Sequence, residues 1–106
     1  MTQLMIRERL PNRRDSETRV FEHGTHTGFL TESFYENGKR AEVFVNFTGA
    51  FSTSDVAAAA RDAAVLVSIA LQHGVPTEMM RAAVTRLDNG EPASITGRIL
   101  DELCAE

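Results

Sequence analysis

The sequence has few of the residues on which redox, disulfide or phosphate-loop chemistry depends. Its 106 residues include one cysteine, Cys104, and no tryptophan, so no disulfide can form within the chain. No apolar run approaches the ~20 residues of a membrane-spanning helix. The first ten residues are interrupted by Arg7, Glu8 and Arg9, unlike a signal peptide, and no GxGxxG or GxxxxGK loop occurs. We therefore expect a cytoplasmic protein without a membrane partner.

Charge is divided unevenly along a chain whose net charge is −4. Residues 1–19 hold five arginines and three acidic residues, a net charge of +2, whereas residues 41–106 hold four basic and nine acidic residues, a net charge of −5. The pattern predicts a basic, irregular arm over residues 1–17 and a single folded domain over 18–106. The overall acidity argues against a protein that coats nucleic acid. The alternative is a solvated tail whose arginines only aid solubility.

Three segments of the first half are typical of antiparallel strands. "TRVFEH" (18–23) and "HTGFLTESFY" (26–35) are rich in threonine and aromatic residues. "RAEVFVNF" (40–47) alternates, with one fully apolar face and a phenylalanine in the middle of the other. Asn37-Gly38, between the last two segments, is a strong hairpin signal in which both residues are expected at positive φ. We expect a meander with one face covered by helices.

The second half has helical spacing. Residues 56–73 contain only two charged side chains, Arg61 and Asp62, which is fewer than a surface helix requires. This helix is therefore expected either to lie buried across the sheet or to meet a partner, and a homodimer suits so small a domain. Gly74 and Pro76 mark a corner between helices. The expected fold class is α+β, with a three-stranded antiparallel meander over about 18–47 followed by helices over about 54–73, 76–87 and 94–104, packed on one face.

Isolated histidines and the cysteine are weak candidates for a site. His73 ends an apolar helix, where the helix dipole favours a cation, and no matching Asp, Ser or Cys lies nearby in the sequence. His23 and His26 could bind a metal together with Glu22, but metal sites usually have three or four ligands and a supporting shell. Acidic neighbours would raise the thiol pKa of Cys104. We expect structural roles for these residues, no metal and no cofactor.

Residues 63–86 have the outline of a helix-turn-helix. Its second helix would present Arg81 and Arg86 to a DNA groove. Apolar residues dominate that helix, and Glu78 offsets its positive charge. Packing within the domain is therefore the better interpretation.

Four fragments together resemble one known family. They are "RLPNRRDSETRVFEHG" (9–24), "ENGKRAEVFVN" (36–46), "AARDAAVLVSIALQHGVP" (59–76) and "MRAAV" (80–84). In this order and spacing they are similar to the TSCPD domain, which occurs at the C-terminal end of adenosylcobalamin-dependent (class II) ribonucleotide reductases and as short free-standing proteins. The Thr-Ser-Cys-Pro-Asp stretch that names the domain is absent, as are the reductases' radical cysteine and redox cysteine pair.

The resemblance implies a non-catalytic accessory or regulatory module that binds a nucleotide, a nucleic acid or a reductase-type partner. One cysteine cannot supply the thiyl radical and dithiol of ribonucleotide reduction, so no catalytic residue is expected. By analogy, basic residues of the arm and hairpin would contact phosphates or an acidic partner; they are Arg9, Arg13, Arg14, Arg19, Lys39 and Arg40. One alternative is a homodimeric interaction module built on residues 56–73, for example an inhibitor or modulator from a phage or mobile element, without a small ligand. Another is a small catalytic domain that uses His73 with a distant carboxylate.

Overall fold

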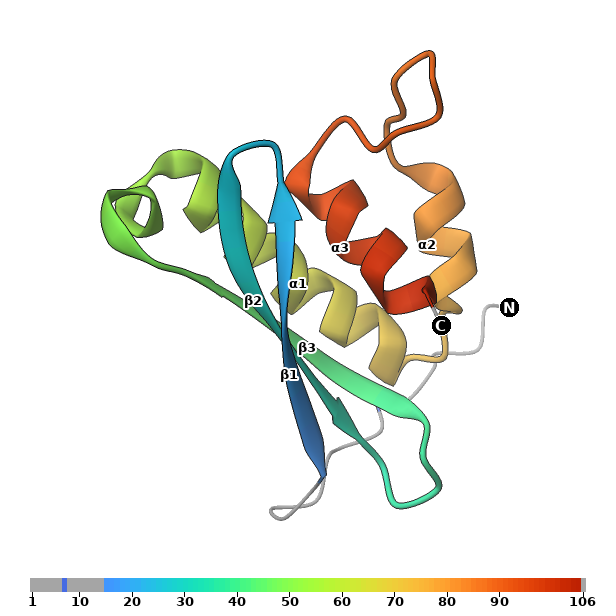
Figure 1. The fold of residues 1–106 in the computed structure, drawn as a ribbon. Coiled ribbons are helices and arrows are strands. Elements are labelled where there is room, and N and C mark those ends of the chain that lie inside the picture. The colour runs from blue at the N-terminus through green and yellow to red at the C-terminus, as the bar shows by residue number, and fades with distance from the viewer. Residues whose placement is uncertain (1–6, 8–14, 106) are drawn as a thin grey trace.

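The computed structural model describes Arg7 and residues 15–105, and it shows an α+β fold with helices on one face of a single sheet (Figure 1). Three antiparallel strands, in the order β1-β2-β3, form the sheet: β1 (Ser16–His23), β2 (His26–Phe34) and β3 (Arg40–Phe47). A 3₁₀ helix, η1 (Gly49–Thr53), leads into α1 (Asp55–Gln72), α2 (Thr77–Ala83) and α3 (Ile95–Cys104). The predicted class, a meander followed by helices, is confirmed.

Alternation along the strands builds the core between sheet and helices. The side chains of Phe21, Leu30, Val43 and Val45 on the inner face are buried, as period-2 patterning requires. At Gly28, a Cβ atom would lie only 2.5 Å from Cε1 of Phe21 and 2.9 Å from the same atom of Phe47. Glycine is needed there because two aromatic rings, 6.1 Å apart between centroids, cover the backbone.

The β2–β3 hairpin exists where it was predicted, but its turn differs. Gly38 has φ of +84°, whereas Asn37 keeps a negative φ, so the expectation of two positive φ values was wrong. Tyr35 O accepts from Gly38 N at 2.9 Å, and Tyr35 N donates to Lys39 O at 2.9 Å. The loop thus has three residues and ends in a left-handed glycine, the second common way to close a hairpin. Asn37 contributes its Oδ1, which accepts from Lys39 N at 2.9 Å.

Helix α1 has a serine cap at its start and, at its end, the glycine that its sequence predicts. Ser54 Oγ accepts from Ala57 N at 3.1 Å, and Asp55 lies in the first turn, where the helix dipole favours an acid. At the other end Gly74 takes φ of +87°, and Val75 N donates to Ala70 O at 3.0 Å, which closes the last turn. These local signals explain why the observed boundaries lie within a residue or two of the expected ones.

Two polar side chains of α1 cover the backbone edge of β3, whose strand neighbour among the described residues is β2 alone. Ser68 Oγ accepts from Val43 N at 2.8 Å, and its one hydroxyl proton has two acceptors, Val43 O at 3.0 Å and Ala64 O at 2.9 Å. Gln72 Nε2 donates to Ala41 O at 3.0 Å. Because both side chains are buried, they satisfy edge groups that water cannot reach.

Helix α2 ends earlier than predicted, at Ala83 instead of about residue 87. Val84 has ψ of 161°, an extended conformation in which its side chain packs against the core. The chain then doubles back, with Ala93 N donating to Thr85 O at 3.1 Å and Leu87 N to Glu91 O at 2.8 Å. Ser94 caps α3 by accepting from Gly97 N at 3.1 Å. The buried face of α3 includes four large apolar residues at helical spacing, Ile95, Ile99, Leu100 and Leu103.

Candidate functional site

A buried carboxylate joins the sheet to the helices. Glu32 lies on the inner face of β2 with 3% of its surface exposed. Arg19 of β1 binds one carboxylate oxygen through Nη1, and Arg40 of β3 binds the other through Nε. Two arginines on one buried carboxylate compensate the cost of removing its charge from water.

The same two arginines hold the end of α3. Arg19 Nη2 donates to Glu102 O at 2.7 Å, and Arg40 Nη2 donates to Leu103 O at 2.7 Å. Carbonyls of a helix's last turn lack partners within the helix and carry its negative dipole, so cations stabilise them. Arg40 Nη1 also donates to Thr77 Oγ1, at the start of α2, at 3.1 Å. This set of six residues, which we call the Glu32 cluster, links all three strands to both C-terminal helices; it comprises Arg19, Glu32, Arg40, Thr77, Glu102 and Leu103.

The structure does not bring the predicted binding residues together at one site. Arg19 and Arg40 are brought together in the Glu32 cluster, where their guanidinium groups are engaged by protein oxygens. Lys39 lies exposed in the β2–β3 turn, apart from that cluster. The other three predicted residues lie outside the described part of the chain: Arg9, Arg13 and Arg14.

The importance of Glu32 was missed from the sequence, although one signal was present. Alternation from Gly28 and Leu30 puts Glu32 on the apolar face of β2, where a charge requires a partner. The arginines that serve it lie on different strands, and no local pattern links them. Arg7 donates from Nε to Gln72 Oε1. This contact adds another polar pair at the same end of the sheet.

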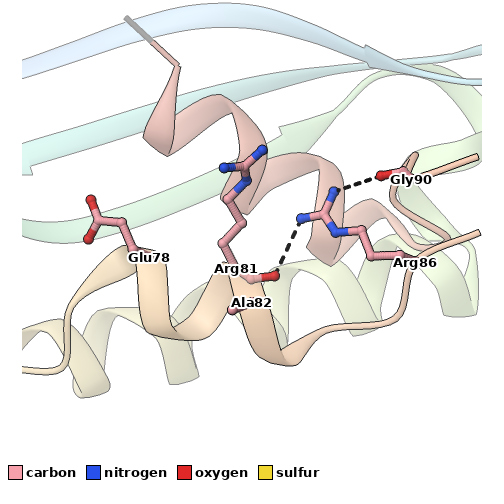
Figure 2. A pocket seen from close by; sticks show the side chains of 5 residues that line it. All are labelled: Glu78, Arg81, Ala82, Arg86 and Gly90. Atoms are coloured by element: carbon pink, nitrogen blue, oxygen red, sulfur yellow. Dashed lines mark hydrogen bonds between the residues drawn. The ribbon is translucent and has the colours of Figure 1, made fainter.

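A second arginine–carboxylate group lies between α2 and α3. Asp101 Oδ1 accepts from Arg81 Nε at 2.8 Å and from Arg86 Nη2 at 2.6 Å, and its Oδ2 accepts from Arg86 Nη1 at 2.9 Å. Arg86 also reaches Gly90 O and Arg81 O, as Figure 2 shows. An open pocket of about 230 Å³ lies beside these groups. Its lining combines Glu78 with the two arginines, and Asp101, which binds both arginines from beside the pocket, balances the remaining positive charge.

Asp101→Asn is expected to weaken the acid dependence of stability. Arg86 and Arg81 hold the pKa of Asp101 well below its ordinary value of 3.8. The unfolded carboxyl is therefore protonated at a higher pH than the native one. Ionised Asp101 stabilises the native state fully at a pH above the pKa of the unfolded carboxyl. This stabilisation is lost as the pH falls from that value toward the lower pKa of the native carboxyl.

The measurement is the urea midpoint between about pH 5 and pH 2. The wild-type midpoint should fall more steeply than that of Asp101→Asn, which should be less stable at neutral pH by about 1 kcal/mol. Asp88→Asn, at an exposed loop carboxylate, is the matched control and should behave like the wild type. Parallel curves for wild type and Asp101→Asn would refute the role given to this ion pair.

The histidines and the cysteine have identifiable structural surroundings. His73 Nδ1 lies 2.9 Å from Ile69 O at the end of α1, and the ring of His26 stacks on Phe51 with centroids 3.8 Å apart. His23 faces His26 across the β1–β2 turn. Burial raises the pKa of the Cys104 thiol, and the carboxylate of Glu78 adds to the increase.

The described residues form neither a cluster of metal ligands nor a membrane-spanning helix. No group of three or more histidine, cysteine, aspartate or glutamate side chains is placed to hold a metal ion within residues 15–105. None of the helices described is both long and apolar enough to cross a membrane.

Comparison with known proteins decides the family. The family model of the TSCPD domain matches residues 5–104. This chain belongs to the TSCPD domain family. The predicted resemblance is thereby confirmed, and the TSCPD match includes all of the strands and helices described above. No solved structure matches the chain.

The relatives of this TSCPD chain are long reductases. It is 36% identical over 74 residues to a vitamin B12-dependent ribonucleotide reductase of Rhodopirellula baltica, covering 70% of this chain and 7% of that protein. The reductases of the same name from Streptantibioticus cattleyicolor and Streptomyces coelicolor are each 35% identical over 92 residues. Those matches cover 86% of this chain and 15% and 9% of the respective proteins. The chain therefore spans a small fraction of the curated relatives that it matches.

Proposed function

We propose that this chain is a non-catalytic accessory module of ribonucleotide reduction that acts by binding a reductase-type polypeptide. The observation that carries the proposal is the match of 92 residues to only 15% or 9% of two vitamin B12-dependent ribonucleotide reductases. In those relatives the matching section accompanies a much longer polypeptide. We therefore expect a related chain to retain the surface that contacts such a polypeptide.

The Glu32 cluster favours a polypeptide partner over a nucleotide. Arg19 and Arg40 were both expected to contact phosphates, yet each binds Glu32 and a carbonyl of α3. A phosphate would have to displace a buried carboxylate from them, and uncompensated burial of that charge is costly. Nucleotide binding would consequently depend on Lys39 and on the three arginines of the predicted arm.

The experiment compares both ligand classes on one protein. Isothermal titration would measure binding to a vitamin B12-dependent ribonucleotide reductase encoded by the same genome. The section of the reductase that matches this chain would first be deleted. Thermal unfolding of the chain with ribonucleotides, deoxyribonucleotides and a short single strand would be measured in parallel. We expect saturable binding to the polypeptide and an unchanged midpoint with nucleotides, because only a ligand of the native state raises the midpoint.

Two results would overturn this proposal. No heat of binding with the reductase polypeptide would remove the partner. A midpoint that rises with a nucleotide, and no longer rises in Arg13→Ala/Arg14→Ala, would assign the function to the basic arm. Arg98→Ala, which removes an arginine paired with Glu91 on the folded domain, is the matched control and should not change either measurement.

A homodimer is the second candidate function, and the surface of α1 favours it. Although one side of α1 is buried against the sheet, Val56, Val65 and Leu66 remain 55%, 52% and 67% exposed. The expectation of a helix buried across the sheet thus holds for one side only, and the other can meet a second copy. Sedimentation of the chain alone distinguishes the two candidates: a stable dimer that dissociates in Leu66→Lys would favour the homodimer.

A further inference from the structure

The two edges of the sheet are finished differently. At the β3 edge, polar side chains of α1 bond the backbone groups of Val43 and Ala41. At the other edge, β1 has β2 as its strand neighbour among the described residues. An edge strand presents a row of backbone N–H and C=O groups that can pair with another chain. The fold therefore closes one edge with its own side chains and leaves the other for comparison.

The outward backbone groups of β1 belong to alternate residues. In an antiparallel pair, residues that bond the neighbouring strand alternate with residues whose N–H and C=O point the other way. Phe34 N donates to Asp15 O at 3.0 Å, so Asp15 belongs to a bonded pair. The register then continues without a bulge to the end of β1, so the odd-numbered residues bond β2. We call the remaining, outward backbone groups the β1 edge; they belong to Ser16, Thr18, Val20 and Glu22.

The β1 edge is accessible along its length. All four of its residues are exposed, and Val20 is 57% exposed. Proteins commonly block an edge strand with proline, lysine or a bulge. The sequence of β1, SETRVFEH, contains neither proline nor lysine, and its register with β2 has no bulge. Within residues 15–105, no segment other than β2 forms a hydrogen bond with the backbone of β1. These are the features of a site for strand addition.

The exposed charged side chains at this edge are acidic. Glu17 and Glu22 are both exposed, and they lie on opposite faces of the strand because side chains alternate. Asp15, which is also exposed, comes directly before the strand. The arginine of β1, Arg19, is held by the Glu32 cluster. Opposite charges on neighbouring strands stabilise their pairing, so a strand that carries lysine or arginine fits this edge on either face.

We propose that the β1 edge docks an extended segment of the partner, which adds to the sheet as a fourth strand and carries lysine or arginine beside Glu17 and Glu22. This inference rests on the proposed function, because the partner is the reductase-type polypeptide. Backbone hydrogen bonds supply affinity in such pairing, and alternate side chains supply specificity. A second copy fits less well, since a two-fold contact pairs β1 with itself and its one arginine already binds Glu32.

Amide exchange tests the β1 edge residue by residue. The probe is the reductase polypeptide lacking its matching section, and the readout is the exchange rate of single amides of the full chain, measured by NMR. In the chain alone, the N–H groups of Thr18 and Val20 face water and should exchange quickly. In the complex we expect their exchange to slow by about tenfold or more, because they become bonded. Asn89, in the exposed turn before α3, is the control and should be unchanged.

Val20→Pro tests the same edge by removing one outward donor. Proline has no N–H, and its ring would lie where the added strand must approach, yet no bond to β2 is lost. We expect a folded variant whose Kd for the polypeptide is weaker by about tenfold or more. Val20→Thr keeps the N–H and a β-branched side chain, so it is the matched control and should bind much like the wild type.

Glu22→Lys tests the charge of the segment without altering the backbone. Reversal at this exposed position should lower the association rate and reduce the dependence of Kd on salt. It also keeps the proposal testable if Val20→Pro does not fold, which the unfolding midpoint of each variant would show. Tighter binding by Glu22→Lys would mean that the segment is acidic, and the proposal would be wrong.

The outcomes separate the β1 edge from the proposed function. If the wild type does not bind the polypeptide, the proposed function and this inference fail together. If the wild type binds while the amides of Thr18 and Val20 exchange as quickly as before, only the β1 edge is excluded as the docking site. If their exchange slows in the chain alone as its concentration rises, a second copy occupies the β1 edge and the inference is overturned.

Discussion

Glu32→Gln is expected to lower the free energy of unfolding by about 3 kcal/mol. The substitution keeps the size of the side chain but removes the charge that Arg19 and Arg40 share. Both guanidinium groups, whose side chains are 38% and 24% exposed, would then lie against a buried neutral amide. Removing one partner of such a cluster costs far more than the pair itself contributes, because the remaining charges are uncompensated. Urea denaturation at neutral pH would measure the loss.

Glu17→Gln provides the matched control. Glu17 lies directly opposite Glu32 in the β1–β2 register, but it is exposed. Its neutralisation should change the free energy of unfolding by less than about 0.5 kcal/mol. Equal effects of the two substitutions would contradict the role given to the Glu32 cluster.

Ser68→Ala is expected to cost about 2 kcal/mol, although it removes one oxygen atom. The hydroxyl group of Ser68 serves both the N–H and the carbonyl of Val43 at the edge of β3. Without it, two buried backbone groups lose their partner, and each carries a desolvation penalty. The measurement is the urea midpoint together with amide exchange of Val43, which should become faster.

Ser52→Ala is the comparison for that variant. Ser52 Oγ also bonds a backbone carbonyl, that of Gly49, at 2.8 Å, but at an exposed position. Water can replace the lost partner there, so we expect a change below about 0.5 kcal/mol. If Ser68→Ala were no more destabilising than Ser52→Ala, α1 would not be protecting the edge of β3.

Local signals in the sequence were sufficient for most of the fold. Ser54 and Gly74 delimit α1 through contacts with residues three or four positions away, and such spacings are legible in a sequence. The alternation of apolar and polar residues predicted β3 and its buried face correctly. Two details were wrong for non-local or geometric reasons. Val84 leaves the α2 helix to pack on the core, and the turn at Asn37 closes as a three-residue loop.

The candidate site was less predictable because its contacts join distant parts of the chain. Arg19 and Arg40 were predicted, by analogy with the family, to contact phosphates or an acidic partner. In the structure Arg40 contacts Leu103 O, 63 residues away, and Arg19 contacts Glu102 O, 83 residues away. Only the position of Glu32 on an apolar strand face hinted at a buried ion cluster. The predicted contacts of Arg13 and Arg14 lie outside the described residues and stay predictions.

The covered face of the sheet holds the arginines in the Glu32 cluster, which stabilises the contact of the sheet with α2 and α3. None of the described helices lies on the opposite face (Figure 1). Two of the predicted binding arginines thus stabilise the fold of this TSCPD domain.

Hydroxyl-radical footprinting of the chain, alone and mixed with the reductase polypeptide lacking its matching section, tests this account most directly. Aromatic, methionine and leucine side chains report on both sides of the molecule, with Phe29 and Phe44 on the strands and Leu66 and Met79 on the helices. The account predicts that oxidation of exposed side chains on one side of the molecule falls in the complex. No protection at any of the four would contradict it.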